Sequence, residues 1–125
     1  MGAGTLVSSG SSLNMPTGSG SERLRRAHIH GLSNAWQEIF TGVAGHIYTI
    51  LLITFTDQET ASGILSIKLN NGTNDVYLTD GQSYGAGETF VWNDKFVIEE
   101  DDDIDVFNSS TNGDWTISYI DQDWT

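Results

Sequence analysis

Two histidines separated by a single residue form the first candidate for a metal-binding motif in this sequence. In "AHIHGLSNAWQE" (residues 27–38), His28 and His30 would point to the same face of an extended strand. Imidazole and carboxylate groups are common ligands of zinc and iron. However, seven residues that include the turn-like "GLSN" separate Glu38 from His30, and His46 is followed by an apolar stretch. Since such a site needs a third ligand, we interpret the pair as strand surface or subunit contact and expect neither a metal nor another cofactor.

A run of carboxylates in the second half is the other candidate cation site. "EEDDDIDVF" (residues 99–107) begins with five consecutive acids, and calcium takes six to eight oxygen ligands. The run lacks both the Gly at the sixth position and the Glu at the twelfth that an EF-hand loop requires. We therefore favour an acidic turn that leads into a strand. A weak divalent-cation site formed by Asp101–Asp103 with Asp121 or Asp123 is the alternative.

Covalent and acid–base catalysis are poorly supported by the sequence. The chain has no cysteine, which removes thiolate chemistry. The G-x-S-x-G pattern of a nucleophile elbow occurs at "GQSYG" (residues 81–85), but this segment is turn-like and no helix is predicted after it, as an elbow requires. Carboxylate pairs catalyse glycoside hydrolysis, but no acid stands in an apolar stretch that would raise its pKa. We predict that the protein is not an enzyme.

The chain is strongly acidic. Its 125 residues include 5 Lys and Arg against 17 Asp and Glu, which gives a formal net charge of −12. Binding to nucleic acid or to an anionic membrane depends on a basic surface, so we expect neither as a partner. The longest apolar run, Ile47–Phe55, has about half the length that a transmembrane helix needs. The length of the chain is that of one domain.

From residue 27 onward the sequence alternates between apolar and polar residues at the period of β-strands. In "GILSIKLN", Leu65, Ile67 and Leu69 share one face, and turns rich in Gly, Asn and Asp separate the segments. We expect an all-β fold, an antiparallel β-sandwich that is jelly-roll-like and has about eight strands, with residues 46–56 covered on both faces. The predicted strands are residues 27–32, 36–41, 46–56, 62–70, 75–79, 88–92 with 95–98, 103–108 and 115–121.

An extended arm of residues 1–26 is expected to precede the sandwich domain of residues 27–125. The arm is rich in Gly and Ser and carries a net charge of +2 (three Arg, one Glu), against −14 (two Lys, sixteen acids) for the domain. Two interpretations stay open: a loose tail, or an arm that becomes ordered on the acidic body of a neighbouring subunit. The candidate contact residues are Leu6, Leu13, Met15, Arg23, Arg25, Arg26 and Trp124.

Aromatic residues permit a different function, because a carbohydrate could stack on them. Most of them alternate with polar residues, and we expect these to fill the core instead. Trp124, near the end of the chain, is expected to dock, with a neighbouring subunit as a candidate. The residues concerned are Trp36, Trp92, Trp115, Trp124, Tyr48, Tyr77, Tyr84 and Tyr119.

Two long stretches carry a resemblance to a known group of proteins. "EIFTGVAGHIYTILLITFTDQETASGILSIKLNNGTNDVYL" resembles the first half of small jelly-roll or Ig-like structural proteins of tailed bacteriophages, and "GAGETFVWNDKFVIEEDDDIDVFNSSTNGDWTISYID" resembles their closing strands. The matching elements include Asp102–Val106 and the pair Ser118-Tyr119, and the likeness covers about residues 36–121. The sequence departs from the pattern in lacking a Pro in the first turn and a Gly before the acidic turn.

This resemblance implies a virion structural role, most simply a capsid decoration (cement) protein. Such proteins sit as oligomers, often trimers, on the outer capsid surface, bind the major capsid protein and extend N-terminal arms onto neighbours. The candidate contact residues above would then face the capsid or another subunit. A carbohydrate-binding component of a head fibre, tail tip or connector is the alternative, and it requires exposed Trp or Tyr side chains in a line. A metal-dependent enzyme of the cupin type ranks third, and it requires a metal on the histidine pair.

Overall fold

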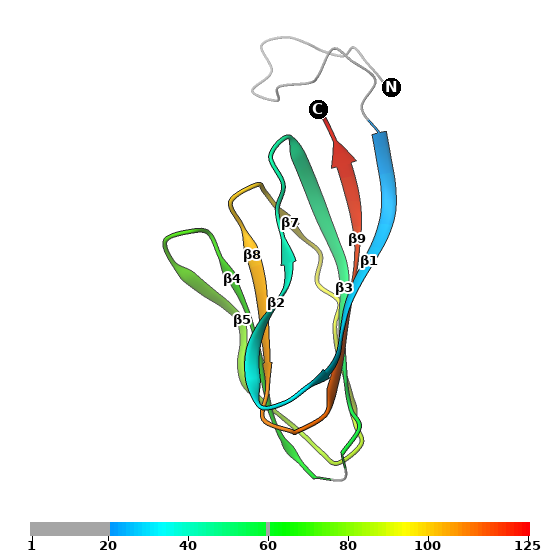
Figure 1. Ribbon diagram of the computed structural model, residues 1–125, viewed down its shortest axis with the longest axis vertical. Coiled ribbons are helices and arrows are strands. Elements are labelled where there is room, and N and C mark those ends of the chain that lie inside the picture. The colour runs from blue at the N-terminus through cyan, green and yellow to red at the C-terminus, as the bar shows by residue number, and fades with distance from the viewer. Residues whose placement is uncertain (1–20, 60) are drawn as a thin grey trace.

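The computed structural model describes residues 21–59 and 61–125, and this part of the chain contains strands and no helix (Figure 1). The prediction of an all-β fold is confirmed. The nine strands are β1 (Ser21–Leu32), β2 (Ala35–Thr41), β3 (His46–Asp57), β4 (Gly63–Asn70), β5 (Asp75–Tyr84), β6 (Thr89–Trp92), β7 (Phe96–Ile98), β8 (Asp103–Asn108) and β9 (Gly113–Asp123).

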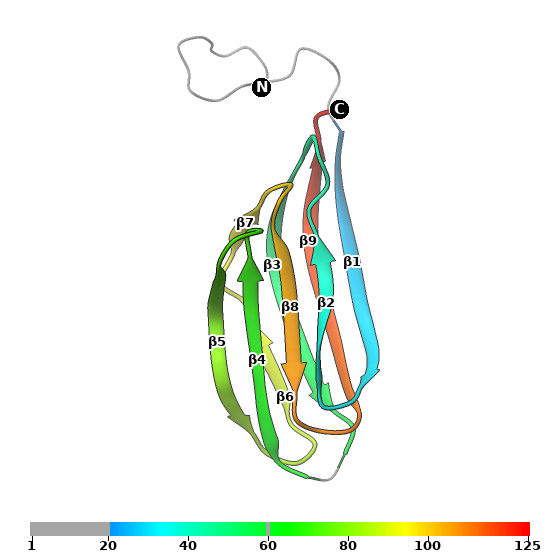
Figure 2. The ribbon, with the colours of Figure 1, turned by 60° about the vertical axis from the view of Figure 1, so that its left-hand side comes forward.

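The strands form two antiparallel sheets that pack face to face as a sandwich (Figure 2). One sheet has five strands in the order β1-β9-β3-β6, with β7 also paired to β3. The other has four strands in the order β2-β8-β4-β5. The chain crosses from one sheet to the other between β1 and β2, β2 and β3, and β3 and β4, and again after β5, β7 and β8. This connectivity is that of a jelly roll, as the sequence predicts.

Two strands extend five or more residues beyond one predicted end. β1 begins at Ser21, so residues 21–26 belong to the five-stranded sheet and not to the predicted arm. They pair with β9 even though their side chains are exposed, because an edge strand is held mainly by its backbone hydrogen bonds. β5 continues to Tyr84, five residues beyond its predicted end, through register shifts in its pairing with β4. Gly81 has a φ of 69° inside this strand, a conformation that glycine adopts without strain.

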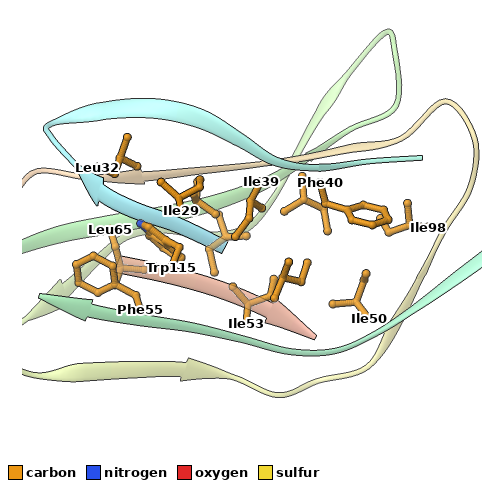
Figure 3. Packing of buried hydrophobic residues seen from close by; sticks show 14 of the residues in the cluster. Ile29, Leu32, Ile39, Phe40, Ile50, Ile53, Phe55, Leu65, Ile98 and Trp115 are labelled. Atoms are coloured by element: carbon orange, nitrogen blue, oxygen red, sulfur yellow. The ribbon is translucent and has the colours of Figure 1, made fainter. Parts of the chain in front are cut away.

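The core lies between the two sheets and is rich in isoleucine (Figure 3). Alternate residues of β3, β8 and β9 point into it, as the period-2 pattern predicts. Phe55 and Trp115 are fully buried, with ring centroids 4.8 Å apart. The buried apolar residues are Ile29, Leu32, Ile39, Phe40, Tyr48, Ile50, Ile53, Phe55, Leu65, Ile67, Tyr84, Ile98, Ile104, Val106, Trp115 and Ile117.

One polar side chain, Asn108 at the end of β8, lies fully inside this core. Its Oδ1 accepts a hydrogen bond from Trp115 Nε1 at 2.9 Å. Its Nδ2 donates to Leu32 O at 2.9 Å and to Ser110 O and Oγ at 3.1 and 3.0 Å. The amide therefore ties the β8–β9 connection to the end of β1 and to the core.

Candidate functional site

The histidine pair lies on the outer face of the five-stranded sheet, the face turned away from the other sheet. His28 and His30 flank the buried Ile29 on β1, so both point outward as expected. His30 Nδ1 lies 2.9 Å from Asp114 Oδ1. Glu38 lies on β2 in the other sheet and is not a partner of the pair.

His46 is the first residue of β3 and lies opposite Asp123, near the end of β9, whereas the histidine pair lies near the start of β9. Two carboxylates lie beside His46. Its Nδ1 is 2.7 Å from Asp121 Oδ1, and its Nε2 is 3.4 Å from Asp123 Oδ1. Asp121 is buried and also accepts a hydrogen bond from Arg25 Nε at 3.1 Å. Arg25, a candidate contact to another subunit, is therefore engaged within its own chain. Within residues 21–59 and 61–125, no three His, Asp or Glu side chains are arranged to hold a metal ion.

The acidic run forms a tight turn between β7 and β8. Asp102 Oδ2 accepts a hydrogen bond from the backbone N–H of Glu99 at 3.0 Å, and Asp102 O accepts one from Gly42 N at 2.8 Å. The turn borders an open hollow of about 370 Å³, which is lined by Gly45, His46, Ile47, Glu99, Glu100, Asp101, Asp102 and Trp124. Trp124 thus docks on its own subunit, where its backbone N–H donates to Gly45 O at 2.9 Å.

The other candidate contact residues are divided between β1 and the part of the chain that is not described. Arg23 and Arg26 are exposed on β1, and Arg26 points outward with His28. Leu6, Leu13 and Met15 lie outside the described residues. The described Arg residues and Trp124 do not form one cluster. They share only the neighbourhood of the Asp121–Asp123 end of β9, where Arg25 pairs with Asp121.

The outer face of the four-stranded sheet carries an aromatic cluster that includes Trp36 and Tyr77, two of the aromatic residues considered above for carbohydrate stacking. Trp36 on β2 contacts Phe107 on β8, with ring centroids 5.5 Å apart, and Tyr77 on β5, with centroids 6.1 Å apart. Lys68 on β4 places its Nζ 4.3 Å from the centroid of the Trp36 ring. We call these four residues the aromatic platform. Each strand of the sheet contributes one of them.

Carboxylates crowd the same face beside the platform. Glu38 and Asp105 are directly opposite each other on β2 and β8. Asp103 lies two residues before Asp105 on β8. Partial desolvation raises the pKa of Glu38 above its ordinary value, and the charges of Asp103 and Asp105 raise it further. Desolvation also raises the pKa of Asp105, an effect that the Lys68 ammonium opposes. The site is thus apolar at its centre and rich in hydrogen-bond acceptors at its edge.

Replacing Glu38 by glutamine is expected to stabilise the fold at pH 7 by roughly 0.2–1 kcal/mol, the size of a like-charge pair across two strands. Because the folded-state pKa of Glu38 is raised, its ionisation disfavours the folded state. The gain should therefore be present above that raised pKa and vanish as the pH falls below the ordinary value of 4.5, where the carboxyl is neutral in both states. Urea unfolding at pH 7 and pH 4 measures it.

The matched control for this effect is Asp94→Asn, which removes the same charge from an exposed loop position in the connection between β6 and β7. An equal gain in the control, or a gain of Glu38→Gln that persists at pH 4, would contradict the assignment to the carboxylate cluster.

The outer face of the five-stranded sheet is different in character because its middle is nearly free of charge, although Glu22 and Asp114 lie toward its two ends. Three neighbouring rows of residues cross the strands in the middle of this face, and none of the 17 Asp and Glu residues of the chain lies in these rows. Leu24 is 77% exposed and Val97 is 55% exposed. The rows are Leu24, Ile120, Thr49 and Val97, then Arg26, Ser118 and Leu52, then His28, Thr116, Thr54 and Val91.

The fold and these two faces define a jelly-roll domain with one charge-poor outer face and one aromatic, acidic outer face. Comparison of the chain with protein-family models, with curated proteins and with solved structures gives no match. In the part of the chain that the structure describes, no helix has the length and apolar character needed to cross a membrane.

Proposed function

We propose that this protein is a virion structural protein, a capsid decoration (cement) protein that binds the major capsid protein on the outer capsid surface. It acts as a closed homo-oligomer, with a trimer as the expected size, and its N-terminal segment supplies additional contacts to the shell. The observation that carries the proposal is the charge-poor outer face of the five-stranded sheet.

This face is the surface on which copies of the chain can meet. Each copy carries a formal charge of −12, so copies repel one another unless their acidic surfaces stay apart. Along the three rows, Arg26 is the one residue that is charged when histidine is neutral. Exposed apolar residues on a charge-poor face favour association through burial of apolar surface. Closed symmetric assembly is the usual result when identical chains associate.

The acidic body is also suited to a position outside a DNA-filled shell. Carboxylates on the four-stranded sheet and on the β7–β8 turn would be repelled by packed DNA phosphates. Oligomerisation multiplies weak individual contacts with the shell, because each bound subunit raises the effective concentration of the next. These points support a decoration role over an internal one.

The first test is the solution mass of the chain by light scattering at low and at moderate salt. A stable trimer would have a mass of about 41 kDa, which is three times 13.6 kDa. Val97→Asp places a charge on the charge-poor face and is expected to convert the oligomer to monomers. Its matched control is Val76→Asp, which alters a similarly exposed valine (51%) on β5 of the other sheet and should leave the mass unchanged.

Two outcomes would overturn this part of the proposal. The first is a monomer at both salt concentrations. The second is an oligomer that Val76→Asp dissociates and Val97→Asp does not, since the contact would then lie on the opposite face.

A further inference from the structure

The aromatic platform places two exposed rings side by side on the outer face of the four-stranded sheet, opposite to the face proposed for self-association. Trp36 is 41% exposed and Tyr77 is 46% exposed. They come from β2 and β5, the two edge strands of the four-stranded sheet (Figure 2). Their centroids are nonetheless only 6.1 Å apart, at an interplanar angle of 74°. Both side chains therefore lean across the sheet and form one continuous apolar surface.

Lys68 and Phe107 hold the Trp36 ring in place. The Lys68 ammonium lies over the ring at 4.3 Å from its centroid and is itself held by Asp75 Oδ2 at 3.3 Å. The Phe107 ring packs against Trp36 with a 38° tilt. A cation over an indole face is a favourable contact, and a ring that is fixed before binding loses little conformational entropy when a ligand stacks on it. The indole is thus held in position before a ligand arrives, and the part of it that Lys68 and Phe107 leave exposed can contact one.

The rim of the platform determines which ligands fit. Glu38 and Asp105 lie in the same cross-strand row as Lys68 and Tyr77, and Asp103 and Asp75 lie in the next row toward the β4–β5 turn. The one cation among them, Lys68, already pairs with Asp75. Ionised carboxylates accept hydrogen bonds and cannot donate them. The rim therefore suits ligands that present hydroxyl or ammonium donors, and it repels anionic ligands. A second copy of the chain is also disfavoured here, because the same acidic rim would face itself.

We propose that the aromatic platform is a carbohydrate-binding site for neutral or amino sugars. The apolar face of a pyranose ring would stack on Trp36 with Tyr77 at its side, while the carboxylates of the rim accept hydrogen bonds from hydroxyl or amino groups. Acidic sugars would be excluded. This function goes beyond self-association and shell binding, since it uses the opposite sheet and requires no capsid.

The test is titration calorimetry of the full chain with three sets of probes: neutral oligosaccharides of glucose and N-acetylglucosamine, glucosamine oligosaccharides, and oligosaccharides of uronic acids. Binding is expected for at least one of the first two sets and for none of the third. Trp36→Ala should weaken binding at least about tenfold, as truncation of a central Trp commonly does. Trp36→Phe should retain part of the affinity because a ring remains.

Two further variants keep the result interpretable. Tyr77→Ala removes an exposed ring from an edge strand, so it should weaken binding without unfolding the protein. Trp124→Ala removes a tryptophan from the hollow beside the β7–β8 turn and should leave binding unchanged.

The proposal is overturned if no neutral or amino oligosaccharide binds, if uronic acids bind equally well, or if Trp124→Ala has the effect expected of Trp36→Ala. Binding restricted to an arginine-rich peptide, included as a fourth probe, would also overturn it and would identify the platform as a protein-docking surface. None of these outcomes depends on the oligomeric state, so the result is distinct from the test of capsid decoration.

Discussion

Replacing Asn108 by alanine is expected to destabilise the fold by about 3 kcal/mol or more. The change removes the side-chain partner of Trp115 Nε1 and the donor to Leu32 O, and both groups lie in the core. Each buried polar group left without a partner costs roughly 1–3 kcal/mol. Urea unfolding measures the loss as a lower transition midpoint at an unchanged slope.

Ser110→Ala is the graded control for this prediction. It deletes the hydroxyl that accepts one of the three Asn108 Nδ2 hydrogen bonds and leaves the contacts to Trp115 and Leu32 in place. Its expected cost is about 1 kcal/mol. A loss in Asn108→Ala no larger than that in Ser110→Ala would mean that the buried amide is not the tie between the β8–β9 connection and the core.

Removal of residues 1–20 is expected to abolish attachment to capsid shells while leaving the fold and the oligomer intact. The cut belongs after Gly20 because β1 begins at Ser21 and residues 21–26 all pair with β9. Cutting after Arg26 would remove half of an edge strand and confuse loss of contact with loss of structure. Ordering an arm costs about 1–2 kcal/mol per residue in backbone entropy, so a single proposed arm would bind the shell weakly. Several arms on one oligomer would bind stably, because each bound arm raises the effective concentration of the others.

Co-sedimentation with shells that lack the protein measures attachment, and light scattering and urea unfolding verify the rest. A full-length variant with Leu6, Leu13 and Met15 changed to serine keeps the chain length and removes the large apolar side chains. It should lose attachment as the truncated chain does. Full decoration of shells by the truncated chain would show that residues 1–20 are not the attachment segment.

The sequence predicts the sandwich well because the apolar residues that form the core recur at every second position in β4, β8 and β9. Leu65 and Ile67 in β4, and Trp115 and Ile117 in β9, face the core as their spacing requires. Residues 46–56 do lie in the interior of a sheet, since β3 pairs with β9 on one side and with β6 and β7 on the other. The expectation that both faces of this strand are covered is wrong, because Thr49, Leu52 and Thr54 point to the outer face, on which no other sheet of the described residues packs.

Apolar–polar alternation fails to predict strand residues that are held by backbone pairing and are not buried. β1 is exposed from Ser21 to Arg26, so its first half carries no apolar alternation although it pairs fully with β9. In β5, the "TDGQSYGAG" segment reads as a turn, but Gly81 absorbs a bulge there. Ser66 Oγ accepts a hydrogen bond from the Gly81 N–H at 2.9 Å, and the strand continues.

The sequence names Trp36 and Tyr77 as possible stacking residues but does not show that they meet on one face, for a related reason. A register shift in β2 between Glu38 and Phe40 places Ile39 and Phe40 both in the core, while Trp36 stays outside. Strict alternation assigns Trp36 and Phe40 to the same face, because both are even-numbered positions of one strand. Only the shift, which depends on pairing with β8, separates them. The lean of Trp36 toward Lys68 two strands away is likewise a property of the assembled sheet.

The pairing of Ser21 with Asp123 has a practical consequence for particle engineering. Both strands that lead to the chain ends run to the same pole of the sandwich (Figure 1). A peptide fused after Thr125 would leave from that pole, where β1 also begins at Ser21. Cargo meant to face solvent is better inserted in the turn at Ala86 and Gly87, between β5 and β6, because that turn lies at the opposite pole and is exposed (Figure 2). The jelly roll would then serve as a display scaffold with its attachment end and its presenting end kept apart.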